Sequence, residues 1–175
     1  MLNEVRIRPY RSADIDAIYE AARESIPEIA PWMPWCHPGY SRDETVAWGE
    51  SRQTDWDAKV EFSFVIEEEN GRVLGSCGLN QFDFPNGTAN LGYWVRTSAT
   101  RQGVATAAVG LLQTWAFANT ELHRLEIKAA LGNIASQQVA LKSGATREAV
   151  LKERFLLHGC RHDAVLFSII RPATS

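Results

Sequence analysis

A short polar loop followed by an apolar helix pattern is the part of this sequence best suited to bind an anion. It spans residues 100–106 and follows a strand pattern that ends near Val95. A helix begins with unpaired N–H groups and a partial positive charge, which together attract anions. Gly103 and Ala105 leave room for phosphate oxygens to approach the backbone, and Arg101 adds a charge. The spacing predicts a phosphate-binding loop; the alternative is a tight helix start that binds nothing.

Other phosphate-binding loops fit this segment less well. It contains no Gly-Lys-Ser/Thr run, which disfavours a P-loop NTPase, and no G-x-G-x-x-G fingerprint of a dinucleotide-binding fold. We therefore expect the anion to be held chiefly by main-chain N–H groups, with one more hydrogen bond from the hydroxyl of Thr106. The main-chain donors are expected to be those of Gln102, Gly103, Val104, Ala105 and Thr106.

The elements that would position this loop predict an α/β (α+β) fold with a single mixed, mostly antiparallel sheet flanked by helices. Strand patterns cover residues 5–9, 62–67, 72–82, 88–95, 125–129, 150–157 and 164–170. Helical spacing covers residues 12–24, a second helix that starts after residues 41–43 and carries Val46, Trp48 and Trp56, and residues 102–119 and 133–142. Asn-Gly turns at residues 70–71 and 86–87 join three strands into a meander.

Length and composition indicate one domain, residues 1–175, with an ordinary balance of 45% hydrophobic and 22% charged residues. The net charge of −3 and the lack of a basic stretch argue against nucleic acid as a partner. No apolar run approaches the roughly 18 residues of a membrane span, and the N-terminus lacks a signal-peptide core. We expect a cytoplasmic protein, either a monomer or a homodimer.

The cysteine and histidine pattern predicts neither a disulfide framework nor a metal site. The three cysteines are odd in number and widely spaced. His158, Cys160 and His162 alternate as ligands on a strand could, but Gly159 between them predicts a turn, and no fourth ligand is evident beyond the Cys36-His37 pair. A nucleophilic role for Cys160 is not expected either, since no partner base is designated.

The loop and two further motifs resemble one protein family. Residues 102–106 look like the pyrophosphate loop of the GCN5-related N-acetyltransferases, whose pattern is Arg/Gln-x-x-Gly-x-Gly/Ala. Residues 91–95 are similar to the Ile-Gly-Tyr-Trp-Ile strand of the RimJ/RimL-type branch, which acetylates the N-termini of ribosomal proteins. Residues 133–136 are similar to its Asn-x-x-Ser motif. Two residues depart from the family pattern. Thr100 stands where the loop motif begins with Arg or Gln. Asn90 stands just before the Gly-Tyr-Trp strand, where the branch often has Glu.

The resemblance implies direct attack of an amine on the thioester of acetyl-CoA, without an acyl-enzyme and without a metal. It implies that the pantetheine arm pairs with the strand that carries Trp94 and Val95, and that the N–H of Tyr93 or Trp94 polarises the carbonyl. Ser136 would stabilise the leaving thiolate. Asn133 would bond the pantetheine amide region and can also act as a helix N-cap.

The acceptor side is less defined by the sequence. An α-amino group has a pKa near roughly 7.7–8.0, so a weak base is enough to deprotonate it. Glu153 and Asp83 are the candidate bases, although each can equally be a solvated or paired carboxylate. Trp32 and Trp35, in a proline-rich loop, are predicted to wall the acceptor pocket, to anchor the loop on the core, or to divide these roles.

Three functions are compatible with these residues. The first is acetyl-CoA-dependent acetylation of a protein or peptide N-terminal α-amine. The second is acetylation of a small-molecule amine, such as an antibiotic, an amino acid or a polyamine. The third is a non-catalytic CoA-binding module, which the departures at Thr100 and Asn90 keep open.

Overall fold

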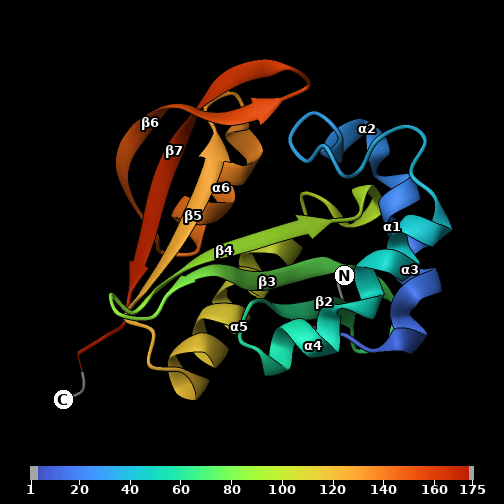
Figure 1. The fold of residues 1–175 in the computed structure, drawn as a ribbon, viewed down its shortest axis with the longest axis horizontal. Coiled ribbons are helices and arrows are strands. Elements are labelled where there is room, and N and C mark those ends of the chain that lie inside the picture. The colour runs from blue at the N-terminus through green and yellow to red at the C-terminus, as the bar shows by residue number, and fades with distance from the viewer. Residues whose placement is uncertain (1–3, 174–175) are drawn as a thin grey trace.

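A seven-stranded mixed sheet organises the computed structural model, which describes residues 4–173 (Figure 1). The spatial order is β1-β2-β3-β4-β5-β7-β6, with β4 and β5 parallel and every other neighbouring pair antiparallel. The strands are β1 Val5–Pro9, β2 Phe62–Glu68, β3 Val73–Asp83, β4 Thr88–Val95, β5 Arg124–Ala130, β6 Thr146–Leu157 and β7 Cys160–Ile170. The helices are α1 Ile15–Glu24, α2 Ile26–Ile29, α3 Arg42–Glu50, α4 Arg52–Asp57, α5 Val104–Asn119 and α6 Ile134–Lys142.

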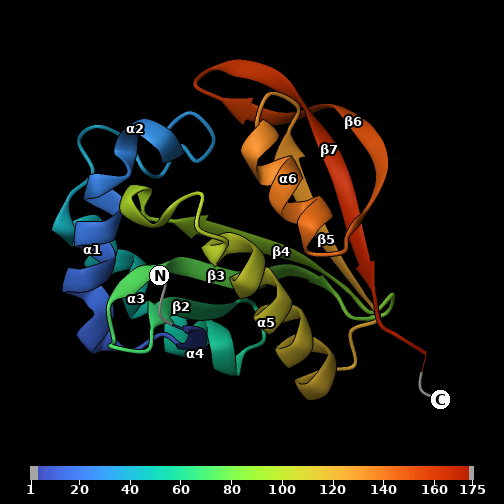
Figure 2. The ribbon, with the colours of Figure 1, turned by 180° about the vertical axis from the view of Figure 1, so that it is seen from behind.

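Helices cover both faces of the sheet because successive strand residues point to opposite sides. In β2, Phe64 and Ile66 belong to the core cluster that contains Leu112 of α5. Val65, between them, instead packs in a cluster with Ile18 of α1. Accordingly, α1 and α3 lie on one face of the sheet, and α5 with α6 on the other (Figures 1 and 2).

The sheet opens between β4 and β5. These strands pair only over residues 88–90 and 124–126, and Figure 1 shows them diverging beyond that point. The rest of β4, residues 91–95, pairs with β3 on one side and, in the part of the chain that the structure describes, has no strand partner on the other. A stretch of main chain is therefore available to a ligand at the centre of the sheet.

The predicted fold class is confirmed, and the differences are local. Helix α5 begins at Val104 rather than Gln102, because Arg101 and Gly103 both adopt a left-handed backbone, with φ of 60° and 83°. The expected second helix is divided at Ser51 into α3 and α4. Among residues 4–173, no helix has the length and apolar character needed to cross a membrane.

Candidate active site

The N-terminus of α5 presents free main-chain donors to a cleft between the diverging strands. Gly103 is the N-cap, and no side chain within residues 4–173 caps the helix. The N–H of Ala107 donates to the carbonyl of Gly103 at 2.9 Å, so the N–H groups before it have no partner within the helix. A Cβ at Gly103 would meet nothing within 4 Å, which leaves space for a bulky anion.

The side chains of the loop divide into those that face the cleft and those that turn back. The Thr100 hydroxyl donates to the carbonyl of Thr97 at 2.8 Å, and the Gln102 amide donates to the carbonyl of Ser98 at 2.9 Å. Gln102 was predicted to contact the cofactor, but it does not line the cleft. Arg101 does line it. So does Lys142 at the end of α6, a cation that the sequence analysis did not single out.

The cleft, here called the β4–β5 cleft, has a volume of about 530 Å³. It runs from the α5 N-terminus along the end of β4 to the start of α6. Eight of the residues predicted to bind or act on the cofactor line this cleft, and they come from all three elements: Trp94, Val95, Gly103, Val104, Ala105, Thr106, Asn133 and Ser136. Segments far apart in the sequence thus form one channel, which leads from the N-terminus of α5 to the middle of the sheet.

Tyr93 and Ser136 meet in this cleft. The Tyr93 hydroxyl lies 3.0 Å from Ser136 Oγ and 3.0 Å from the Ser136 carbonyl oxygen. Burial raises the pKa of Tyr93 to about 12, against the opposing effect of the Ser136 hydrogen bond, so the phenol stays protonated. Asn133 caps α6 by accepting from the Ser136 N–H at 3.1 Å, and this fixes the turn that carries the serine.

The backbone of β4 distinguishes the two predicted carbonyl-polarising donors. The Arg96 N–H donates to the carbonyl of Leu74 in the direction of β3, at 2.7 Å. Because alternate residues of a strand bond to the same neighbour, Trp94 also faces β3, while Tyr93 faces the open side. The N–H of Tyr93 is therefore the available one of the pair.

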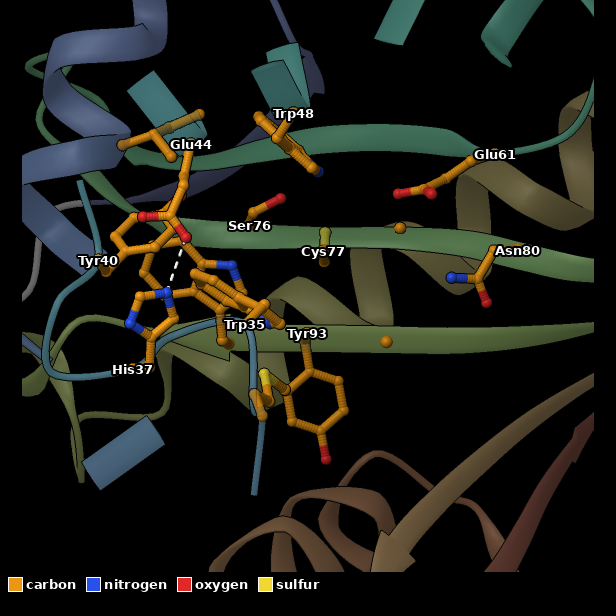
Figure 3. Close-up of a pocket in the computed structure, with 15 residues that line it drawn as sticks. Trp35, His37, Tyr40, Glu44, Trp48, Glu61, Ser76, Cys77, Asn80 and Tyr93 are labelled. Carbon is orange, nitrogen blue, oxygen red and sulfur yellow. Dashed lines mark hydrogen bonds and ion pairs between the residues drawn. The ribbon is translucent and has the colours of Figure 1, made fainter. Parts of the chain in front are cut away.

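A second cavity, here called the α1-side cavity, approaches β4 on the face covered by α1 and α3 (Figure 3). Its volume is about 360 Å³. Its walls are aromatic, with Tyr40, Trp48 and Trp94 among them. It shares Trp94, Tyr93 and Met33 with the β4–β5 cleft, so the two cavities meet at β4.

The two loop tryptophans belong to different cavities. Trp35 is 40% exposed and lines the α1-side cavity, with its ring centroid 5.6 Å from that of Trp94. Trp32 lines the β4–β5 cleft and lies against Gly132, where an added Cβ would come within 3.4 Å of the indole. Of the two, Trp35 is thus the one placed to contact a ligand in the α1-side cavity.

The candidate bases Glu153 and Asp83 line neither cavity. Glu153 is exposed on β6 with φ of 48°, and its N–H donates to Asp163. Asp83 accepts from Asn86 in the β3–β4 turn. Because neither carboxylate lines the two cavities that meet at β4, a role for either as the base stays a prediction.

The carboxylates that do line the α1-side cavity are Glu44 and Glu61, which sequence reasoning missed. In the sequence, Glu44 indicates only the start of a helix, because it is the third helical residue of a capping box with Ser41. Its Oε1 lies 2.7 Å from His37 Nε2, and its Oε2 accepts from the Ser41 N–H. These bonds, with His37 contributing most, lower the pKa of Glu44.

Of the three cysteines, Cys77 lines the α1-side cavity, and Cys36 and Cys160 line neither cavity. Cys36 and Cys77 are buried, and burial raises the pKa of each thiol. Cys160 is exposed at the β6–β7 hairpin, where the neighbouring His158 ring lies 2.7 Å from the Ala30 carbonyl oxygen. Within residues 4–173, no group of three or more His, Cys, Asp or Glu side chains is arranged to hold a metal ion.

Comparison with known proteins assigns the chain to one protein family. Residues 4–146 match the model of the acetyltransferase (GNAT) domain. YdaF of Bacillus subtilis, provisionally named a ribosomal N-acetyltransferase, is 27% identical over 95% of this chain and 91% of its own. A solved RimL, a ribosomal L7/L12 α-N-protein acetyltransferase in complex with coenzyme A, shares the fold, with a TM-score of 0.88, 22% identity and coverage of 95% and 93%. Mycobacterium smegmatis RimJ in complex with CoA-disulfide aligns with a TM-score of 0.87, 25% identity and coverage of 96% and 82%.

Proposed function

Because the chain belongs to the acetyltransferase (GNAT) domain family and is an acetyl-CoA-dependent N-acetyltransferase, we propose that its acceptor is the N-terminal α-amine of a protein. The observation that carries the proposal is the meeting of two cavities at Tyr93 and Trp94. One cavity has an anion site at its far end, and the other opens on the opposite side of β4. An acyl donor and an amine can thus reach the same point of the strand together.

The donor fits the β4–β5 cleft. Its pyrophosphate is placed at the α5 N-terminus, where free N–H groups and Arg101 supply hydrogen bonds and charge, with Lys142 on the far wall. Its pantetheine arm is placed along the unpaired side of β4, where Tyr93 and Val95 direct their main-chain groups. The thioester then lies near Ser136.

In the proposed reaction, the neutral amine nitrogen attacks the thioester carbon. A carbon–nitrogen bond forms, the carbon–sulfur bond breaks, and the electron pair of that bond stays on sulfur. The Tyr93 N–H stabilises the oxyanion, and the Ser136 hydroxyl donates to the leaving thiolate. One proton of the attacking nitrogen finally reaches the sulfur, so that an amide and a thiol are released.

The names of the relatives support a protein acceptor. The RimL structure is that of an α-N-protein acetyltransferase, and YdaF carries a ribosomal name. A small-molecule amine is the second candidate, favoured by one observation. The α1-side cavity has Glu44 and Glu61 among its lining residues but neither lysine nor arginine, and its walls are aromatic, a combination that also suits a small cation.

Thiol release from acetyl-CoA distinguishes these acceptors. Thiol release would be measured with four kinds of acceptor: peptides with free Ser, Ala or Met N-termini, the same peptides blocked at the α-amine, a polyamine, and an aminoglycoside. Turnover restricted to free N-termini, with the acetyl group located on the α-nitrogen by mass spectrometry, is the expected result. Turnover on the small amines alone would overturn the protein acceptor. Coenzyme A binding without turnover on any amine would favour the non-catalytic module.

A further inference from the structure

A row of polar side chains crosses three strands at one end of the α1-side cavity. Asn80 of β3 lies opposite Asn90 of β4, and the Asn90 amide donates to Asn80 Oδ1 at 3.0 Å. On the other side of β3, Leu79 lies opposite Phe62, so Glu61, the residue before Phe62, comes next to Asn80. Side chains at opposed positions share a face of the sheet. Glu61 and Asn80 both line the cavity.

The floor between this row and the reacting part of β4 carries no side chains. Gly78 and Gly92 lie directly opposite each other on β3 and β4, and both line the cavity. A Cβ at Gly92 would come no closer than 4.0 Å to a neighbour, namely the Asn90 amide nitrogen. Neighbouring strands are about 4.8 Å apart and each strand residue adds about 3.4 Å, so Glu61 starts about 14 Å from Tyr93, three residues beyond Asn90 on β4. Its side chain, the bound amine and one or two waters can together span that gap.

Glu61 has one carboxylate oxygen free to use. Its Oε1 lies 2.7 Å from Arg52 Nη1 and accepts from the Ser63 hydroxyl at 2.8 Å. Its Oε2 has no hydrogen bond from any residue within 4–173. Figure 3 shows the carboxylate directed into the cavity, and the side chain is 28% exposed. Glu44, in contrast, uses both of its oxygens.

The pairing with Arg52 orients Glu61 without fully neutralising it. The same guanidinium also pairs with Asp55, whose Oδ2 lies 2.8 Å from Nη2, and it stacks over the Trp48 ring. Arg52 is nearly buried, with 10% of its side chain exposed. One cation thus serves two carboxylates, and the excess negative charge lies beside the cavity.

We propose that Glu61 binds the acceptor's ammonium group and removes its proton, directly or through water. The inference rests on the proposed function and names the proton acceptor of that reaction. The ammonium gives one proton to the carboxylate, and the nitrogen lone pair thus freed attacks the thioester. Glu61 then returns its proton to solvent, and the second proton lost by the nitrogen goes to the thiol.

The pH dependence of Glu61→Gln tests this role. With an N-terminal peptide of amine pKa about 7.7–8.0, the variant can use only the neutral amine, of which about 5% is present at pH 6.5. We expect its kcat/KM to fall at least about tenfold relative to the unaltered protein at pH 6.5, and the two to converge near pH 9. The matched control is Asp55→Asn, which removes the other carboxylate paired with Arg52, at a residue that lines neither of the two cavities. Its pH profile should run parallel to that of the unaltered protein.

Glu61→Asp keeps a carboxylate one methylene shorter, so it should have a reduced kcat/KM but retain activity at low pH. It also keeps the test decisive if Glu61→Gln does not fold. A Glu61→Gln profile parallel to that of the unaltered protein, or a Glu61→Asp profile that tracks the neutral amine fraction alone, would overturn the proposal. Failure of the unaltered protein to acetylate any amine would instead count against the proposed function.

Discussion

The hydroxyl of Tyr93 lies 3.0 Å from Ser136 Oγ and joins strand β4 to helix α6 across the cleft between β4 and β5. The two residues are 43 positions apart in the chain. The contact places the hydroxyl of Ser136 beside the strand that is expected to hold the thioester. It also gives that hydroxyl a neutral partner, because Tyr93 has a pKa of about 12.

Ser136→Ala should lower kcat by about 10- to 100-fold, because a hydrogen bond to a charged thiolate contributes about 1.5–3 kcal/mol. The dissociation constant of coenzyme A should stay nearly unchanged, since Ser136 is expected to act on the leaving sulfur. Thiol release at saturating substrates and calorimetric titration of coenzyme A measure the two quantities. The matched control is Ser143→Ala at the other end of α6, whose hydroxyl donates to the Val139 carbonyl. An unchanged kcat in Ser136→Ala would remove the leaving-group role.

Tyr93→Phe should lower kcat less than Ser136→Ala does, by a few-fold, because it removes the partner of the serine and not the serine itself. Losing a buried hydrogen bond should also decrease the free energy of unfolding by about 1 kcal/mol. Denaturant unfolding and steady-state kinetics on the same sample separate these effects. In the double variant the two kcat losses should not add, since both act through one hydroxyl. Full additivity would show that the residues act independently.

Gly103→Ala should raise the KM for acetyl-CoA and destabilise the fold by about 1–2 kcal/mol. The destabilisation comes from the left-handed backbone of Gly103, with φ of 83°, which alanine adopts only at a cost. It does not come from crowding, since no atom lies within 4 Å of the added methyl group. Gly110→Ala is the control: it lies inside α5, is equally uncrowded, and should stabilise the protein by up to about 1 kcal/mol. Equal melting temperatures for the two variants would contradict this account.

Glu24 should make stability depend on pH in the acid range. Its hydrogen bonds to Arg96, which is 8% exposed, lower the pKa of Glu24 to about 2. Because the pKa of Glu24 is lower in the folded protein than in the unfolded chain, its ionised carboxylate stabilises the fold at pH values above about 4.5. That contribution is lost as the pH falls from about 4.5 to about 2. Because Glu24 is partly solvated, we expect it to contribute no more than about 2 kcal/mol.

Denaturant unfolding between pH 2 and 7 checks the sign. Glu24→Gln should be less stable than the unaltered protein at pH 7, and the two should become similar near pH 2. Glu24 also accepts a hydrogen bond from the Ser98 N–H at 2.7 Å, just before the loop at residues 100–106. The KM of Glu24→Gln for acetyl-CoA should therefore be several-fold higher than that of the unaltered protein. A stability difference that is the same at all pH values would contradict the ion-pair assignment.

The elements and the family were predictable from the sequence because their signals are local. Asn-Gly turns, helical spacing and the loop at residues 100–106 gave the order of strands and helices, and the family assignment is confirmed. The exact start of α5 was missed because the left-handed positions at Arg101 and Gly103 can be read only from the backbone. Arg101 is one of them, and nothing in its chemistry announces a positive φ.

The acceptor side could not be predicted, because its residues become neighbours only through strand register. Glu61 is adjacent to Asn80 through the β2–β3 pairing, and Glu44 reaches the cavity from a helix start. Glu153 was chosen for its residue type alone, and its exposed position on β6 lies outside both cavities. The roles of Ser136 and Asn133 remain predictions, although their positions in the cleft are compatible with them.

The meeting of the two cavities at β4 also constrains the order of events in turnover. Since each cavity reaches Tyr93 and Trp94 by its own route, neither substrate has to vacate the site before the other enters. Initial rates measured at several fixed acceptor concentrations should therefore give intersecting double-reciprocal lines, the pattern of a ternary complex, rather than parallel ones. If the proposed function holds, the acetylated product can likewise leave while coenzyme A is still bound in the β4–β5 cleft, so the two products need not depart in a fixed order.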